Sequence, residues 1–171
     1  SQAIWTYPSA GSIFTGLYPE THGSQQFHQG LREEHPRITD GFGEEVATAC
    51  FSTTLGVSPE RGFDRGFDEF HHIGDEDAGL RPDIMERCND RLLPWLKQHA
   101  DEGFFAVVWS MGTHHPFLTP DSEAVDNPAE PMQNASEIPG TQDWMRRLPA
   151  DRRHDVIGYY DDAIEHADAK L

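Results

Sequence analysis

The chain has 171 residues, of which 36% are hydrophobic and 11% aromatic. This composition suits one domain with a sizeable core and argues against a disordered chain. A formal net charge of −17 argues against nucleic acid and anionic membranes as main partners, because such a surface repels both. Acidic residues outnumber Lys and Arg by 30 to 13 along the whole chain, so we expect a protein adapted to concentrated salt. A merely acidic mesophilic protein is the alternative.

The sequence shows no signal peptide and no membrane-spanning segment, which favours a cytoplasmic location. Its two cysteines, Cys50 and Cys88, match no metal-binding or redox spacing. We therefore expect two buried or free thiols.

The first half of the chain predicts one helix and one strand. Pro8 suits the first turn of a helix that continues to Leu17, with Gly16 as its stop and Pro19 just beyond. Residues 20–43 are polar and rich in Gly and His, which predicts a loop. The run VATACF at residues 46–51 predicts a buried strand, and residues 56–82 again predict loops.

The second half predicts a strand between two helices. Asp83 is a good cap for a helix to about residue 100, which Pro94 should bend. The apolar run FFAVVWSM at residues 104–111 predicts a central parallel strand covered on both faces. Residues 112–150 predict irregular surface. From about Asp155, spacings of three and four predict an amphipathic helix with an apolar face made of Ile157, Tyr160, Ile164, Ala167 and Leu171.

Alternation of strands with helices predicts an α/β layered fold. The chain starts within a dense motif and ends within a helix. We therefore expect residues 1–171 to be an internal piece of a single larger domain.

The dense motif is IWTYPSAGSIFTGLYPETHG at residues 4–23. Thr6 lies just before the predicted helix, where free backbone N–H groups and the helix dipole favour an anion. A hydroxyl at that place can attack a phosphate or sulfate ester whose oxygens those N–H groups hold. The small residues 9–12 would let a substrate or a strand approach. Taken alone, the pattern favours a plain helix cap.

The whole stretch resembles the active-site signature of the sulfatases in the alkaline phosphatase superfamily. The matching positions are Pro8-Ser9, Ser12, Thr15-Gly16, Tyr18-Pro19 and His22-Gly23. Three later segments agree in order, namely GFDEF at residues 66–70, FFAVVWSMGTHHP at 104–116 and YDD at 160–162. The resemblance implies part of an alkaline phosphatase-like three-layer α/β/α sandwich. It also implies a sulfatase-like catalytic domain that hydrolyses sulfate or phosphate esters.

The resemblance also implies roles for single residues. Thr6 occupies the position of the sulfatase cysteine that is oxidised to formylglycine, so Thr6 is predicted to be nucleophile and metal ligand. His114 takes the place of the histidine near the leaving oxygen, with a backbone-bonded loop histidine as the alternative. Ser9 and Ser52 are predicted to contact a small-molecule ester. His22 is predicted to close a turn. The implied cofactor is a divalent metal, Ca²⁺ before Mn²⁺ or Zn²⁺, with most ligands outside this chain.

Departures from the pattern open two alternatives. Ala10 replaces the arginine that follows Pro-Ser, and Phe51–Thr54 lacks the family's Lys and His. A threonine nucleophile instead resembles that of phosphodiesterases and phosphoethanolamine-type transferases, which is the first alternative. The missing residues also suit a non-catalytic sulfatase-like remnant. We expect residues 1–171 alone to be inactive.

Overall fold

The computed structural model describes residues 3–26, 28–74, 81–114, 117, 119–120 and 153–170. The chain divides into two compact units. The first unit comprises Ser1–Gly79 and Arg87–Ser110, and the second comprises Leu80–Glu86 and Met111–Leu171. Most of the segment 112–150 lies outside the described residues, so its prediction as irregular surface stays a prediction.

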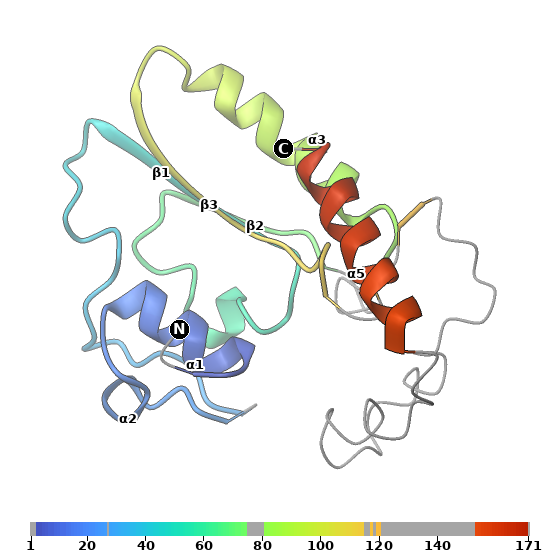
Figure 1. Ribbon diagram of the computed structural model, residues 1–171. Helices are drawn as coiled ribbons and strands as arrows, with labels where there is room; N and C mark the ends of the chain where they lie inside the picture. Colours follow the sequence, from blue (N-terminus) through green and yellow to red (C-terminus); the bar gives the residue numbers. More distant parts are fainter. Residues whose placement is uncertain are drawn as a thin grey trace. The chain divides into compact units, whose positions relative to one another are not determined.

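A parallel sheet forms the centre of the first unit (Figure 1). Its strand order is β2-β1-β3, with β1 at Val46–Ser52, β2 at Glu69–His72 and β3 at Gly103–Trp109. Both predicted strands are confirmed, each to within two residues. All three strands are parallel, so their carboxyl ends meet at one edge of the sheet.

Strand β2 lies in a segment for which the sequence predicted loops. Its sequence EFHH is short and mostly polar, and neither feature is typical of a strand. The side chain of Glu69 instead finds partners within the first unit. It accepts a hydrogen bond from the Trp95 indole at 3.0 Å, and its other oxygen lies 3.1 Å from His71 Nε2.

A reciprocal set of hydrogen bonds between Asp68 and Thr48 fixes the register of β2 on β1. One carboxylate oxygen of Asp68 accepts from the Thr48 N–H at 2.8 Å and from its hydroxyl at 2.9 Å. The Asp68 N–H in turn donates to Thr48 Oγ1 at 2.9 Å. The pairing that follows brings Ser52 opposite His72 at the carboxyl edge.

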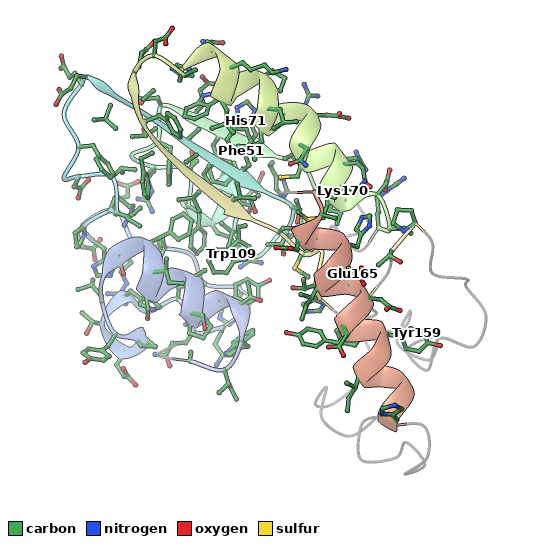
Figure 2. The ribbon with its side chains drawn as sticks, turned by 45° about the horizontal axis from the view of Figure 1, so that its top comes forward. Phe51, His71, Trp109, Tyr159, Glu165 and Lys170 are labelled. Carbon is green, nitrogen blue, oxygen red and sulfur yellow. The ribbon has the colours of Figure 1, made fainter. Side chains whose placement is uncertain are left out.

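Two apolar clusters cover the two faces of this sheet. Helix α1, at Thr6–Thr15, packs on one face, and helix α3, at Ile84–Gln98, contributes to the other. The first cluster consists of Ala10, Phe14, Leu31, Cys50, Val57 and Phe63. The second consists of Ala49, Phe51, Cys88, Leu92 and Trp95. Figure 2 shows Trp109 directed towards α1, and Phe51 and His71 towards α3. The first unit therefore has the predicted helix–sheet–helix layering.

Helix α1 begins two residues earlier than its sequence predicted. Trp5, in an extended conformation, is the N-cap, and Thr6 is the first helical residue. Pro8 still falls in the first turn, where a missing N–H is tolerated. Gly16 ends the helix with a φ of 70°, as predicted. A four-residue helix, α2 at Pro19–His22, and a 3-10 helix at Pro59–Arg61 lie in the segments for which the sequence predicted loops.

The second unit contains helix α5 at Arg153–Asp168, which confirms the predicted helix. The predicted apolar face is confirmed at Ala167, which is buried, and wrong at Ile157, Tyr160 and Ile164, which are exposed. Ala163, outside that face, is buried, and Leu171 lies outside the described residues. Ion pairs tie this end of the chain to Glu86. Glu86 Oε1 lies 2.9 Å from Lys170 Nζ and 3.4 Å from His166 Nε2. Glu165 and Lys170 are labelled on this helix in Figure 2.

Candidate active site

Thr6 lies at a helix N-terminus that no side chain caps. The N-cap Trp5 offers no side-chain hydrogen bond, and the described first turn of α1 contains no acidic residue. Helix N-termini carry unpaired N–H groups and a partial positive charge. The half-buried Thr6 side chain is thus attached where an oxyanion is favoured and where no carboxylate of the first turn competes for the site.

The loop that follows β1 lies against this helix start. A Cβ atom built on Gly56 would lie 3.2 Å from Thr6 Cγ2 and 3.4 Å from Thr54 Oγ1. Glycine at position 56 therefore permits the close approach of the Thr6 methyl group. Thr6 is in this way brought to the carboxyl edge of the sheet, where ligand sites of α/β folds gather. Sequence reasoning missed Gly56, since a glycine after a strand carries no specific signal.

Two further predicted site residues hold backbone in place. The Ser9 hydroxyl donates to the carbonyl oxygen of Ala3 at 3.0 Å. Ser52 is fully buried, and its hydroxyl donates to the Thr54 carbonyl at 3.3 Å. The Thr54 hydroxyl oxygen accepts the Gly56 N–H at 3.1 Å, which shapes the loop beside Thr6. Substrate contact by Ser9 and Ser52 stays a prediction.

Arg61 brings positive charge to the first turn of α1. Its guanidinium carbon lies 4.6 Å from the ring centroid of Tyr7, the residue after Thr6. Its Nε donates to the Leu55 carbonyl at 2.9 Å, which holds the guanidinium in this position. Burial raises the pKa of the Tyr7 phenol, although the charge of Arg61 opposes this rise. Position 10 is a fully buried alanine in the core under α1. Arg61 thus places a cation against the ring of Tyr7, the residue after Thr6.

His22 holds the two ends of the motif together. Its ring is fully buried, and its Nδ1 accepts the Ser24 N–H at 3.0 Å. A neutral histidine then carries its proton on Nε2, which lies 3.2 Å from the Pro8 carbonyl and 3.2 Å from Ser12 Oγ. Burial lowers the pKa of His22, so the neutral form is favoured. These contacts agree with the predicted role of His22 in closing the turn.

His114 belongs to the second unit and lies in a turn after β3. Its N–H donates to the Met111 carbonyl at 2.9 Å, and its own carbonyl accepts from Phe117 at 2.9 Å. The side chain is half-buried. The role of His114 at a leaving group stays a prediction, and His115 lies outside the described residues.

The described residues do not provide a complete metal site. Within residues 3–26, 28–74, 81–114 and 153–170 no group of three or more His, Cys, Asp or Glu side chains could hold a metal ion. Thr6 is the one ligand that the sequence assigned. No helix in the described part of the chain is long and apolar enough to cross a membrane.

Comparison with solved structures and families defines the class of protein. The chain is similar to the lipoteichoic acid synthase LtaP from Listeria monocytogenes, with a TM-score of 0.57 and 24% identity over 97% of this chain and 38% of that one. The chain thus spans well under half of that protein. The parallel sheet and its helices have the alkaline phosphatase-like fold, of which this chain forms part.

The sulfatase family matches residues 1–171, and the chain belongs to this family. Its members are generally hydrolytic enzymes that use a divalent metal ion. A search of curated proteins finds no match.

Proposed function

We propose that the full-length protein hydrolyses a small-molecule sulfate or phosphate ester, or transfers its acidic group, with Thr6 as nucleophile. One observation carries this proposal. Thr6 stands at the uncapped N-terminus of α1, with its methyl group beside the Gly56 loop at the carboxyl edge of the sheet. Membership of the sulfatase family supports the reaction class.

The first chemical step forms a covalent enzyme intermediate. Thr6 Oγ1 attacks the phosphorus or sulfur atom, loses its proton to solvent, and the bond from that atom to the leaving ester oxygen breaks. The helix N-terminus and the Arg61 charge stabilise the negative oxygens as they develop. His114 protonates the leaving oxygen in this proposal. Attack by water or by an acceptor alcohol then releases Thr6.

The metal requirement is part of the same proposal. Family members generally use a divalent metal, and we propose Ca²⁺ ahead of Mn²⁺ or Zn²⁺. The His, Cys, Asp and Glu side chains of the described residues do not form a complete metal site, so no chemical step above depends on the ion. A cytoplasmic location and adaptation to salt are likewise proposed from composition.

Substitution at Thr6 tests the nucleophile. In the full-length protein, Thr6→Ala should lower kcat by at least about a thousandfold, because removal of a covalent nucleophile removes the whole pathway. Thr6→Ser is the matched control, since it keeps a hydroxyl and should keep most of the activity. Turnover of Thr6→Ala at the wild-type rate would remove Thr6 from the mechanism.

A substrate panel separates hydrolysis of the two ester classes from the alternatives. Aryl sulfate, aryl phosphate and an aryl phosphodiester should be supplied to the full-length protein with Ca²⁺, Mn²⁺ and Zn²⁺ in turn. Preference for the diester would favour a phosphodiesterase or a phosphoethanolamine-type transferase, to which the threonine at position 6 is chemically suited. No turnover with any metal would favour a non-catalytic remnant, for which the buried Ala10 is the supporting observation.

A further inference from the structure

A polar cavity of about 550 Å³ lies between strand β2 and helix α3. Its lining from the strand consists of Phe70, His71, His72 and Ile73, and its lining from the helix consists of Arg87, Asp90 and Arg91. All seven residues belong to the first unit. None of them has a role in the proposed chemistry at Thr6, so the cavity needs an explanation of its own.

The charge in this cavity is opposite to that of the chain. Acidic residues exceed Lys and Arg by 30 to 13 overall, yet the described lining of the cavity carries two arginines and one carboxylate, that of Asp90. Arg87 and Arg91 are four positions apart on α3, so their side chains lie on the same face of the helix. Two neighbouring guanidinium groups are the usual partners of phosphate and sulfate oxygens, which they bind through paired N–H donors.

His71 gives the cavity a fixed wall. His71 stacks on Phe51 with ring centroids 4.7 Å apart, and its Nε2 lies 3.1 Å from Glu69 Oε2. His72 follows His71 in the strand, so its side chain is directed to the opposite face of the sheet and does not face α3.

The cavity is larger than one oxyanion needs. Its volume falls in the range of small-molecule sites, and Ile73, which packs with the apolar cluster on the α3 side, adds an apolar part to its lining. The ligand class that fits is thus a phosphate or sulfate group attached to a carbon skeleton. His72 pairs with Ser52 across the sheet, and neighbouring strands lie about 4.8 Å apart. The cavity therefore adjoins the edge at which Thr6 is placed.

We propose that the cavity between β2 and α3 binds a phosphate or sulfate group, held by Arg87 and Arg91. The bound phosphate or sulfate is either a free anion or a second acidic group on the substrate, the ester of which Thr6 attacks. The second source rests on the proposed function, whereas the anion site itself does not.

Calorimetric titration of the full-length protein with inorganic phosphate and with sulfate tests the site. Arg91→Gln alters an exposed side chain and should weaken binding about tenfold, and Arg87→Gln/Arg91→Gln should abolish one binding event. Asp90→Asn should strengthen the same event, because it removes the carboxylate that the described lining places beside Arg87 and Arg91. Arg32→Gln, at an exposed arginine outside the cavity, is the control and should bind as the wild type does. Unchanged titrations of Arg91→Gln and of the double variant would overturn the proposal.

Kinetics distinguishes the two sources of the anion. An aryl phosphate that carries a second phosphate group should show a KM raised about tenfold or more by Arg87→Gln/Arg91→Gln relative to Arg32→Gln. A KM unchanged by the double variant, with phosphate titration still lost, would assign the cavity to the free anion. Absence of turnover with aryl phosphates and with aryl sulfates would refute the proposed function. Loss of phosphate binding in the arginine variants would still establish the anion site.

Discussion

Gly11→Ala is the sharpest test of the packing inside the nucleophile motif. A Cβ atom at position 11 would lie 2.7 Å from His22 Nδ1 and 2.9 Å from His22 Nε2. The ring is fully buried and held at both nitrogens, so it cannot move aside without loss of its hydrogen bonds. A substitution that favours helices elsewhere should therefore destabilise this protein.

The magnitude follows from the contacts that His22 would lose. Displacement of the ring breaks the hydrogen bond from Ser24 to Nδ1 and the Nε2–H bond that Pro8 and Ser12 share, at about 1.5 kcal/mol each for buried groups, or about 3 kcal/mol together. The higher helix propensity of alanine returns about 1 kcal/mol. We expect Gly11→Ala to lower the free energy of unfolding by about 2 kcal/mol.

Denaturant unfolding followed by tryptophan fluorescence measures this difference. Gly158→Ala in α5 is the matched control, because a Cβ atom there meets nothing within 4 Å and should raise stability by about 0.5–1 kcal/mol. A double variant with His22→Ala should recover most of the Gly11→Ala loss, since the obstructing ring is gone. Stabilisation by Gly11→Ala, or strict additivity in the double variant, would refute the reasoning.

Three further predictions concern titration, salt and thiol chemistry. Burial lowers the pKa of His22, so the unfolded chain binds a proton below about pH 6.5 that the folded chain does not, and stability should fall as pH drops from 6.5 towards the lowered pKa. His22→Gln should flatten the dependence of the unfolding free energy on pH, measured from unfolding curves. An unchanged pH dependence would contradict the role of His22. The melting temperature should rise between dilute and molar KCl, because salt screens the repulsion of a net charge of −17; no rise would exclude adaptation to salt. Burial raises the pKa of Cys50 to about 12 and that of Cys88 to about 11, so mass spectrometry should find both thiols unalkylated in the folded protein at pH 8 and alkylated after denaturation. Rapid alkylation of either folded thiol would contradict this burial.

The predictable part of the fold is the part that is strongly apolar. β1, β3 and α3 were predicted because their apolar residues form runs or recur every four positions, and the structure buries them in two clusters. β2 was missed because its stability comes from paired polar groups around Glu69, which leave no periodic signal. The sequence likewise does not report the ion pairs of Glu86 with His166 and Lys170, because these residues lie some eighty positions apart in the chain.

The candidate site also has one part that the sequence predicted and another that it did not. Thr6 was identified from the motif, because the order of hydroxyl, proline and small residues is local information. Gly56 and Arg61 come to Thr6 and Tyr7 only through tertiary contacts, and no spacing in the sequence reports such contacts. The small residue at position 11 was interpreted as space for a substrate or strand, whereas the structure fills that space with the His22 ring.

The hydrogen bonds between Asp68 and Thr48 determine how this protein can vary. Side chains alternate between the two faces of a strand, so a slip of β2 by one residue would move Phe70 and His71 each to the face that it does not now occupy. Asp68 prevents this slip from within the strand pairing, independently of the length of the preceding loop. The loop between β1 and β2 can therefore change in length while the same residues, Ser52 and His72, stay opposite each other at the carboxyl edge.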